Sequence, residues 1–148
     1  MEPDIFMQEA LKEAKQGWEE WGIPIGSVLV KDGKIIGRGH NKRVQGQNQI
    51  LHAEIDCLQN AGRIKDFQGV ILYSTLMPCY MCAGAAVQFG IKKVVVGESK
   101  NFSGAKQFME NHGIEVIDLD SDACKDMMAK FIKEKPELWD EDNGVFNS

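Results

Sequence analysis

The sequence predicts an α/β fold in three layers, with a mixed five-stranded sheet between two layers of helices. Two apolar stretches, residues 25–31 and 34–39, flank Asp32-Gly33, a dipeptide typical of a two-residue hairpin turn. Helical and strand patterns alternate after this hairpin, which favours parallel strands with helices on the sheet faces. The 148 residues are 43% hydrophobic, enough for a substantial core. We therefore expect residues 1–148 to form a single domain.

The first element is predicted to be an amphipathic helix over residues 4–20, followed by the hairpin. Its apolar residues recur at helical spacing: Ile5, Phe6, Ala10, Leu11 and Ala14. Gly17 and Gly22 then weaken the helical pattern before the first strand.

Two further helices are expected to begin at chemically reactive residues. Residues 52–61 carry apolar side chains at helical spacing and are followed by Gly62, a plausible helix stop. Residues 70–74 are predicted to form a short apolar strand. The next helix is predicted over residues 79–89 and ends at Gly90.

The last third of the chain continues the alternation. Residues 94–96 are predicted to form a buried strand. A helix, a strand and a helix are expected to follow over residues 104–112, 114–118 and 121–134. Pro136 ends the last of these helices, and residues 136–148 are expected to form a C-terminal lid or tail.

Charge and composition exclude several classes of protein. The formal net charge is −5, from 17 basic and 22 acidic residues, which disfavours binding of nucleic acid through its phosphates. No signal peptide and no apolar run of membrane-spanning length is visible. Four cysteines without a secretory signal favour metal binding or catalysis over disulfides, and a cytoplasmic location is expected.

Two motifs carry the chemistry, and each opens a predicted helix. The first is His52-Ala53-Glu54, and the second is Pro78-Cys79-Tyr80-Met81-Cys82. Cys79 and Cys82 are three residues apart, so both thiols lie on one helix face near its positive end, which favours thiolates. The 27 residues before Cys79 can hold a helix, a turn and a strand that return the chain to His52. Three soft ligands without a fourth are the arrangement of a catalytic zinc site.

Glu54 supplies the proton transfers that a metal alone does not provide. A carboxylate two residues from a ligand histidine can take a proton from water and deliver it to a leaving amine. The combination H-x-E with P-C-x-x-C is the signature of zinc-dependent deaminases.

Two alternatives to a catalytic site remain open on the residues alone. The motif residues could be a core histidine with two buried thiols. A non-catalytic zinc-binding module would need a fourth ligand, for which Cys57 and Cys124 are the candidates. We interpret both as small core residues, because Cys57 is turned off the His52 face and Cys124 is distant in sequence. Glu54 also speaks against a purely structural zinc.

On these motifs and several others, the sequence resembles the cytidine deaminase-like superfamily, and within it the fungal-type cytosine deaminases. The resemblance covers nearly the whole chain. The stretches that carry it are Pro24-Ile25-Gly26, Gly37 to Asn41, Leu51 to Glu54, Thr75 to Cys82, Val96-Gly97-Glu98 with Asn101-Phe102, and Pro136 to Asp142.

The resemblance implies a cytidine deaminase-like fold and a role for each matching residue. It places the zinc ligands on His52, Cys79 and Cys82 and the proton shuttle on Glu54. The residues implied to bind substrate are Asn41 at the ring carbonyl, Asp142 at the ring N–H, Phe102 and Trp139 as lid aromatics, and the backbone of Ala53, Met77 and Cys79. A homodimer is also implied, for which the apolar run 83–89 and Met127-Met128 could provide an interface, with a role in the core as the alternative.

The implied reaction is hydrolytic deamination of free cytosine to uracil and ammonia. A ring N–H facing Asp142 exists only when no ribose occupies that nitrogen, so a nucleoside would leave a buried carboxylate unpaired. Ala53 is also typical of guanine deaminases and tRNA adenosine deaminases, and Met77, Tyr80 and Asn143 depart from the fungal pattern. Guanine, adenosine in tRNA or another cyclic amine therefore remain as alternative substrates.

Overall fold

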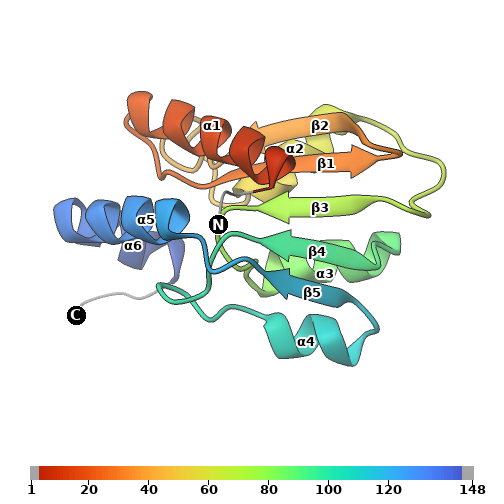
Figure 1. Ribbon diagram of the computed structural model, residues 1–148. Helices are drawn as coiled ribbons and strands as arrows, with labels where there is room; N and C mark the ends of the chain where they lie inside the picture. The colour runs from red at the N-terminus through yellow and green to blue at the C-terminus, as the bar shows by residue number, and fades with distance from the viewer. Residues whose placement is uncertain (1–3, 145–148) are drawn as a thin grey trace.

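The central layer of the molecule is one five-stranded sheet with the strand order β2-β1-β3-β4-β5 (Figure 1). The computed structural model describes residues 4–144. Its strands are β1 (Gly26–Lys31), β2 (Lys34–His40), β3 (Ile71–Ser74), β4 (Lys93–Val96) and β5 (Glu115–Asp118). β1 pairs antiparallel with β2 and β3, whereas β3, β4 and β5 are parallel. The predicted mixed sheet is confirmed.

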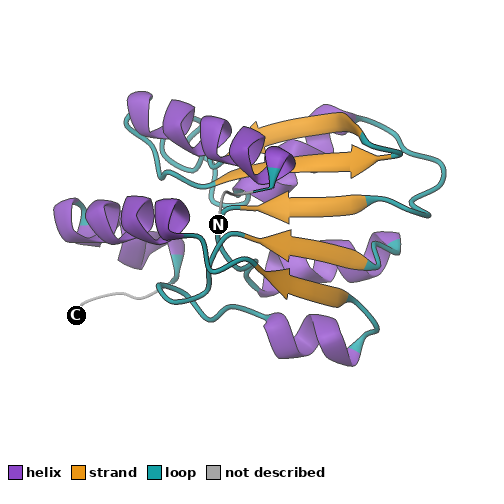
Figure 2. Cartoon of the chain, viewed as in Figure 1, coloured by secondary structure: helices purple, strands orange, loops and turns teal. Residues whose placement is uncertain are grey.

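Helices cover both faces of this sheet and complete the three layers (Figures 1 and 2). One face carries α1 (Ile5–Glu19) and α5 (Asp122–Glu134), and the other carries α2 (Ala53–Ala61), α3 (Tyr80–Phe89) and α4 (Lys106–Asn111). The observed ends lie within two residues of the predicted ones. Asp4 and Ser121 cap α1 and α5 by accepting backbone N–H bonds, which explains why these helices begin where they do.

Alternate residues of the strands supply a separate apolar cluster on each face. Leu72 points to the α2, α3 and α4 side, and its neighbour Tyr73 points to the α1 and α5 side. Ala83 and Ala86 of α3 are fully buried in the first cluster. Met128 is buried in a third cluster beside the sheet. These three residues are core, which is the alternative role considered for them, so they are not available to a dimer interface.

The segment from Pro136, expected as a lid or tail without a predicted helix, forms a further helix, α6 (Pro136–Asp142). Lys135 ends α5 and precedes α6 with φ −137° and ψ 61°, so the chain turns sharply between the two helices. Pro136 is in the first turn of α6, where its missing N–H is not needed. Leu138 and Trp139 pack onto the third cluster. Residues 145–148 of the predicted tail lie outside the described residues.

The strand register brings several chain segments to one edge of the sheet. Gly26 pairs with His40, Ser27 with Ser74, and Ser74 with Val96. The residues just before β1 and just after β2, β3 and β4 therefore share this edge. It is the edge at which parallel strands of α/β sheets end and where ligands commonly bind.

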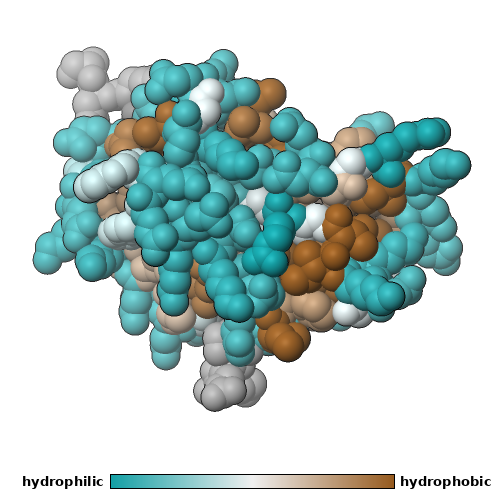
Figure 3. All heavy atoms as spheres, turned by 90° about the horizontal axis from the view of Figure 1, so that it is seen from above, coloured by the Kyte–Doolittle hydropathy of each residue, from teal (hydrophilic) through white to brown (hydrophobic). Residues whose placement is uncertain are grey.

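The outer surface is mostly polar when seen from above (Figure 3). Hydrophilic residues cover most of this view, and a hydrophobic patch lies toward its right side. No helix within residues 4–144 is long and apolar enough to span a membrane.

Candidate active site

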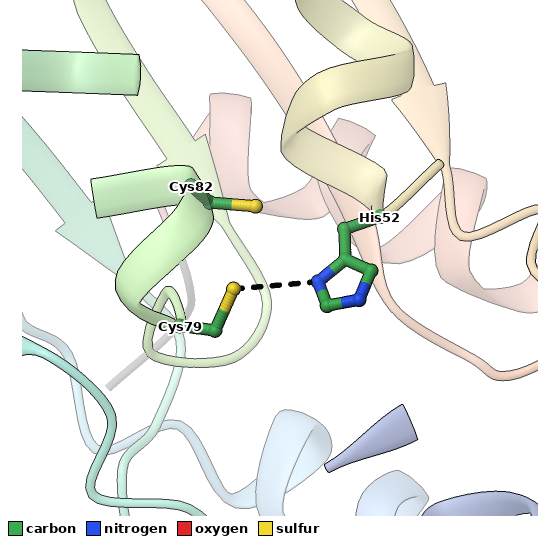
Figure 4. Close-up of side chains that lie close together, drawn as sticks. All are labelled: His52, Cys79 and Cys82. Atoms are coloured by element: carbon green, nitrogen blue, oxygen red, sulfur yellow. Dashed lines mark hydrogen bonds between the residues drawn. The ribbon is translucent and has the colours of Figure 1, made fainter. Parts of the chain in front are cut away.

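His52, Cys79 and Cys82 meet between the starts of two helices (Figure 4). Their ligand atoms all lie within 4.8 Å of one another, and Cys79 Sγ is 3.4 Å from His52 Nδ1. His52 lies at the N-cap of α2 and Cys79 at the N-cap of α3, while Cys82 is in the first turn of α3. The structure thus brings together the three predicted ligands. The helix and strand between His52 and Cys79 return the chain to His52, as expected.

The backbone at these two N-caps turns the ligand side chains away from their own helices. His52 and Cys79 are both extended, with ψ of 162° and 178°, and neither side chain caps its helix. Pro78 therefore lies one residue before the N-cap and not within the helix. Its carbonyl accepts the backbone N–H of Ala105, which ties the Cys79 end of α3 to the segment before α4.

The ionisable side chains of His52, Cys79 and Cys82 shift one another's pKa values. A hydrogen bond from the Cys82 thiol lowers the pKa of Cys79 to about 4; burial opposes this shift, and His52 adds to it. Cys79 is therefore a thiolate at neutral pH, the form that binds zinc. Burial disfavours the charged imidazole of His52, but Cys79, Asp142 and Glu54 outweigh burial and raise its pKa to about 9. The donor set of one imidazole and two thiols fits zinc.

Glu54 lies two residues from His52 in the first turn of α2 and is 4% exposed. Burial raises the pKa of this carboxyl to about 7, and the nearby negative charge of Cys79 adds to the effect. A carboxyl with a pKa near neutral pH can both accept and release a proton, as a general acid–base catalyst must.

Asp142 reaches the same place from α6, 90 positions after His52 in the chain. Its Oδ1 lies 3.3 Å from Nε2 of His52 and accepts a hydrogen bond from the Asn41 side-chain amide over 3.3 Å. Burial raises the pKa of Asp142, while His52 and Asn41 oppose that shift. Since Nδ1 of His52 faces Cys79, the carboxylate at Nε2 fixes the ring orientation.

A small cavity of about 20 Å³ adjoins these groups. Of the predicted residues, His52, Glu54, Met77, Cys79, Phe102, Trp139 and Asp142 line it. Phe102 and Trp139 meet edge to face, with ring centroids 5.9 Å apart. Asn41 and Ala53 are fully buried behind the lining, and Asn41 contacts the site through Asp142.

Comparison with known proteins is consistent with this geometry. A sequence model for the "Cytidine and deoxycytidylate deaminase zinc-binding region" matches residues 2–98, which include His52, Glu54, Cys79 and Cys82. The chain belongs to this family. The deaminase is 47% identical over 141 residues to cytosine deaminase of Candida albicans, covering 93% of this chain and 94% of that one.

Other relatives of the deaminase act on different bases. It is 37% identical over 143 residues to a tRNA-specific adenosine deaminase of Bacillus subtilis, covering 88% and 89% of the two chains. A solved structure from work on A-to-I editing by tRNA:A34 deaminases superposes with a TM-score of 0.74 at 31% identity, over 82% of this chain and 97% of that one. A guanine deaminase structure from Nitrosomonas europaea, at 22% identity and a TM-score of 0.76 over 88% and 84% of the chains, shares the fold.

Membership in the family makes zinc the metal of this deaminase, and the donor set described above is suited to it. Cys57 and Cys124 belong to the two apolar clusters of the sheet faces, as predicted, and burial raises their pKa values to about 12 and 11. Both remain protonated at neutral pH. Neither belongs to the metal-binding group, which consists of His52, Cys79 and Cys82.

Sequence reasoning missed two residues that line the cavity, Ile25 and Leu76. Ile25 precedes β1 and Leu76 follows β3, so both lie at the sheet edge where the site forms. Both belong to sequence stretches that carry the family resemblance. Their membership in these stretches was the signal that could have identified them as cavity residues. Asn143, noted as a departure from the fungal pattern, also lines the cavity. Its side chain donates to the carbonyl of Trp139 over 3.1 Å.

Proposed function

We propose that this zinc-dependent deaminase converts free cytosine to uracil and ammonia, as in pyrimidine salvage. The observation that carries the proposal is the meeting of Asp142 and Asn41 beside His52 and Glu54. This arrangement places a carboxylate on the cavity wall and an amide directly behind it, and we propose that the two bind one small planar ring. The 47% identity to a cytosine deaminase, over nearly the full length of both chains, supports the same choice of base.

In this proposal, His52, Cys79 and Cys82 would hold the zinc, and the zinc would lower the pKa of an attacking water to roughly 7. Glu54 would accept one proton of the attacking water as its oxygen adds to C4 of the base. The same carboxyl would pass this proton to N3, then take the remaining proton of the added oxygen and deliver it to the departing amine, so that uracil and ammonia leave. The burial that raises the pKa of Glu54 to about 7 suits both halves of this cycle.

Asp142 and Asn41 are proposed to recognise the edge of the base that carries no amine. Asp142 would accept the ring N–H, and the Asn41 amide would donate to the ring carbonyl. The backbone of Ala53, Met77 and Cys79 would complete the binding of the ring. A nucleoside has no hydrogen at that ring nitrogen, so the buried Asp142 would lose a partner, at a cost of about 1–3 kcal/mol.

Phe102 and Trp139 are proposed to form a lid. A cavity of about 20 Å³ accommodates little more than one water by the usual criterion. Entry of a base therefore requires these aromatic side chains to move. Their return would exclude water and strengthen the interactions of Glu54 and Asp142 with the ring.

Ammonia release from a panel of amines tests the choice of substrate. We expect turnover of cytosine well above that of cytidine, guanine, adenine and tRNA. The Glu54→Gln protein serves as the blank, because it keeps the zinc ligands and lacks the proton shuttle. Turnover of guanine without turnover of cytosine would contradict the proposed base.

A second candidate is adenosine in tRNA, favoured by the His52-Ala53-Glu54 form of the motif and by the 37% identity to a tRNA-specific deaminase. The net charge of −5 speaks against it, because binding of RNA phosphates depends on basic residues. Tight, salt-sensitive binding of tRNA together with no turnover of cytosine would establish this second candidate.

We further propose a cytoplasmic homodimer that associates through the α2 and α3 face. A groove there is lined in part by Leu58, Phe67, Ala85 and Phe89, and Phe89 is 49% exposed. Phe67 and Phe89 stack with ring centroids 5.5 Å apart and give the groove an apolar wall. Sedimentation is expected at twice the chain mass of 16.5 kDa, and sedimentation at the chain mass would contradict the dimer.

A further inference from the structure

Asp56 is a buried carboxylate on α2 that holds the end of β2. It is 2% exposed and lies one helical turn after His52. The Lys42 ammonium is 3.1 Å from its Oδ1 and 3.0 Å from its Oδ2. The backbone N–H of His40 donates to Oδ2 over 3.1 Å, and the Asn60 side chain donates to it over 3.4 Å. These partners compensate a buried charge that would otherwise be strongly unfavourable.

The two main partners of Asp56 lie on either side of Asn41. His40 precedes Asn41 and is bound through its backbone, whereas Lys42 follows it and is bound through its side chain. The Asn41 backbone N–H donates in turn to the carbonyl of Ile25 over 3.0 Å. One carboxylate on α2 thus holds the short segment that presents the Asn41 side chain.

The backbones of α2 and β2 approach closely at Gly39. A Cβ at this position would lie 2.5 Å from Oδ2 of Asp56 and 2.6 Å from the backbone N of Cys57. A Cβ at Gly37 would lie 2.6 Å from Cβ of Ala61, one turn further along α2. Asp56 therefore reaches the backbone of β2 only because residue 39 has no side chain.

We propose that Asp56 and Lys42 form a positioning pair, which sets the distance between Asn41 and the end of α2 that carries His52 and Glu54. The inference rests on the proposed function, in which one base contacts Asn41 and Glu54 at the same time. The pair acts through Asn41 and touches no substrate atom. Errors of about 1 Å in such an arrangement can reduce rates by about 100-fold, so a rigid connection between the two groups matters.

A purely stabilising ion pair would behave differently. Loss of such a pair lowers the melting temperature and leaves the KM for cytosine and the Kd of the product uracil unchanged. Loss of a positioning pair raises both constants, because uracil offers Asn41 and Asp142 the same carbonyl and ring N–H. Zinc content is expected to stay constant, since the substitutions leave the backbone hydrogen bond from Asp56 to the carbonyl of His52 in place.

The test compares Lys42→Met with Lys125→Met. Lys125 is a matched control, because it also pairs with two carboxylate oxygens, those of Asp120 at 2.8 Å and Asp122 at 3.4 Å. Lys42→Met is expected to raise the KM for cytosine and the Kd of uracil about tenfold, with kcat changed less. Lys42→Arg, which keeps the charge, is expected to stay close to wild type. Lys125→Met is expected to leave both constants unchanged.

Asp56→Asn provides a second variant of nearly the same shape, should Lys42→Met fold poorly. It is expected to shift KM and Kd in the same direction as Lys42→Met. Wild-type KM and Kd in these variants, with only the melting temperature lowered, would overturn the positioning pair. Failure of the wild-type protein to deaminate cytosine would instead overturn the proposed substrate. The same variants would then be compared on the amine that the panel identifies, and a panel with no turnover would overturn both proposals.

Discussion

At the scale of single residues, His52 and Cys79 occupy positions where most helices have Ser, Thr, Asp or Asn. Such residues stabilise a helix start by about 0.5–2 kcal/mol through a side-chain hydrogen bond to the backbone. Neither His52 nor Cys79 makes that bond, because the two side chains point toward each other within the metal-binding group (Figure 4). Departures from local helix preferences at these two positions therefore mark the functional site.

Glu54→Gln is expected to lower kcat for the preferred base by about 100- to 10,000-fold, because the amide cannot accept or deliver the protons of the reaction. Measurement of ammonia release under saturating substrate checks this. The zinc content, measured by metal analysis, is expected to match that of wild type. The melting temperature should not fall, because burial disfavours the charge that the substitution removes. Wild-type turnover in this variant would contradict the assignment of Glu54 as the proton shuttle.

At the scale of elements, the site is assembled by helices that meet one edge of the sheet. The starts of α2 and α3 bring the metal-binding group, the end of β2 brings Asn41, and α6 brings Trp139 and Asp142. The last of these helices is short and contributes partly buried apolar residues to the third cluster. An element anchored by few buried contacts can open at low free energy, which suits a lid.

Trp139→Ala is expected to lower kcat/KM for cytosine by about 10- to 100-fold, because an open site admits water and holds the base less firmly. Stability should fall by about 1–2 kcal/mol, less than for a fully buried tryptophan. Trp18→Ala is the matched control, since Trp18 packs on Phe131 at 5.8 Å between ring centroids, away from the cavity. Steady-state kinetics and denaturant unfolding of both proteins check this. A loss of stability in Trp139→Ala with kcat/KM unchanged would make Trp139 ordinary core.

Gly39→Ala is expected to destabilise the fold by about 2 kcal/mol or more, because the added methyl group would overlap α2. Gly113→Ala is the control. Gly113 has φ 84° and open space around it, so this variant should lose only about 1 kcal/mol from backbone strain. Urea unfolding gives the free energy of unfolding of both variants. It thereby compares the steric effect in Gly39→Ala with the backbone strain in Gly113→Ala. Equal losses would contradict the close approach of α2 to β2.

At the scale of the whole molecule, the fold has cores that do not depend on the metal. Three apolar clusters pack the described residues on both faces of the sheet and beside it. The metal-binding group joins only two helix starts. Zinc is therefore expected to add to the stability of a fold that forms without it, unlike the zinc of small zinc-stabilised domains.

Removal of zinc by a chelator is expected to abolish deamination while the circular dichroism spectrum stays nearly unchanged. The melting temperature should fall, because zinc binds only the folded chain and stabilises it by about 4 kcal/mol at 1,000 times its Kd. Addition of zinc should restore both activity and melting temperature. Loss of the helical spectrum on chelation would show that the metal is structural.

Local chemistry in the sequence was sufficient to predict the sheet, five of the helices and the metal-binding group. Hairpin turns, helix stops such as Gly62 and Gly90, and the spacing of Cys79 and Cys82 act within one or two turns of chain, so they can be read from neighbouring residues. The chemistry of the site follows from the residue types in His52-Ala53-Glu54 and the cysteine pair, whatever the rest of the fold does.

The tertiary structure decided the contacts that the motifs do not show. It folded the segment after Pro136 into α6, placed Asp142 against His52, brought Ile25 and Leu76 into the cavity wall, and paired Asp56 with Lys42. These contacts depend on strand register and on burial of side chains far apart in sequence. Neither quantity is encoded in any short stretch of residues, because each is settled only when the sheet and its two layers of helices pack together.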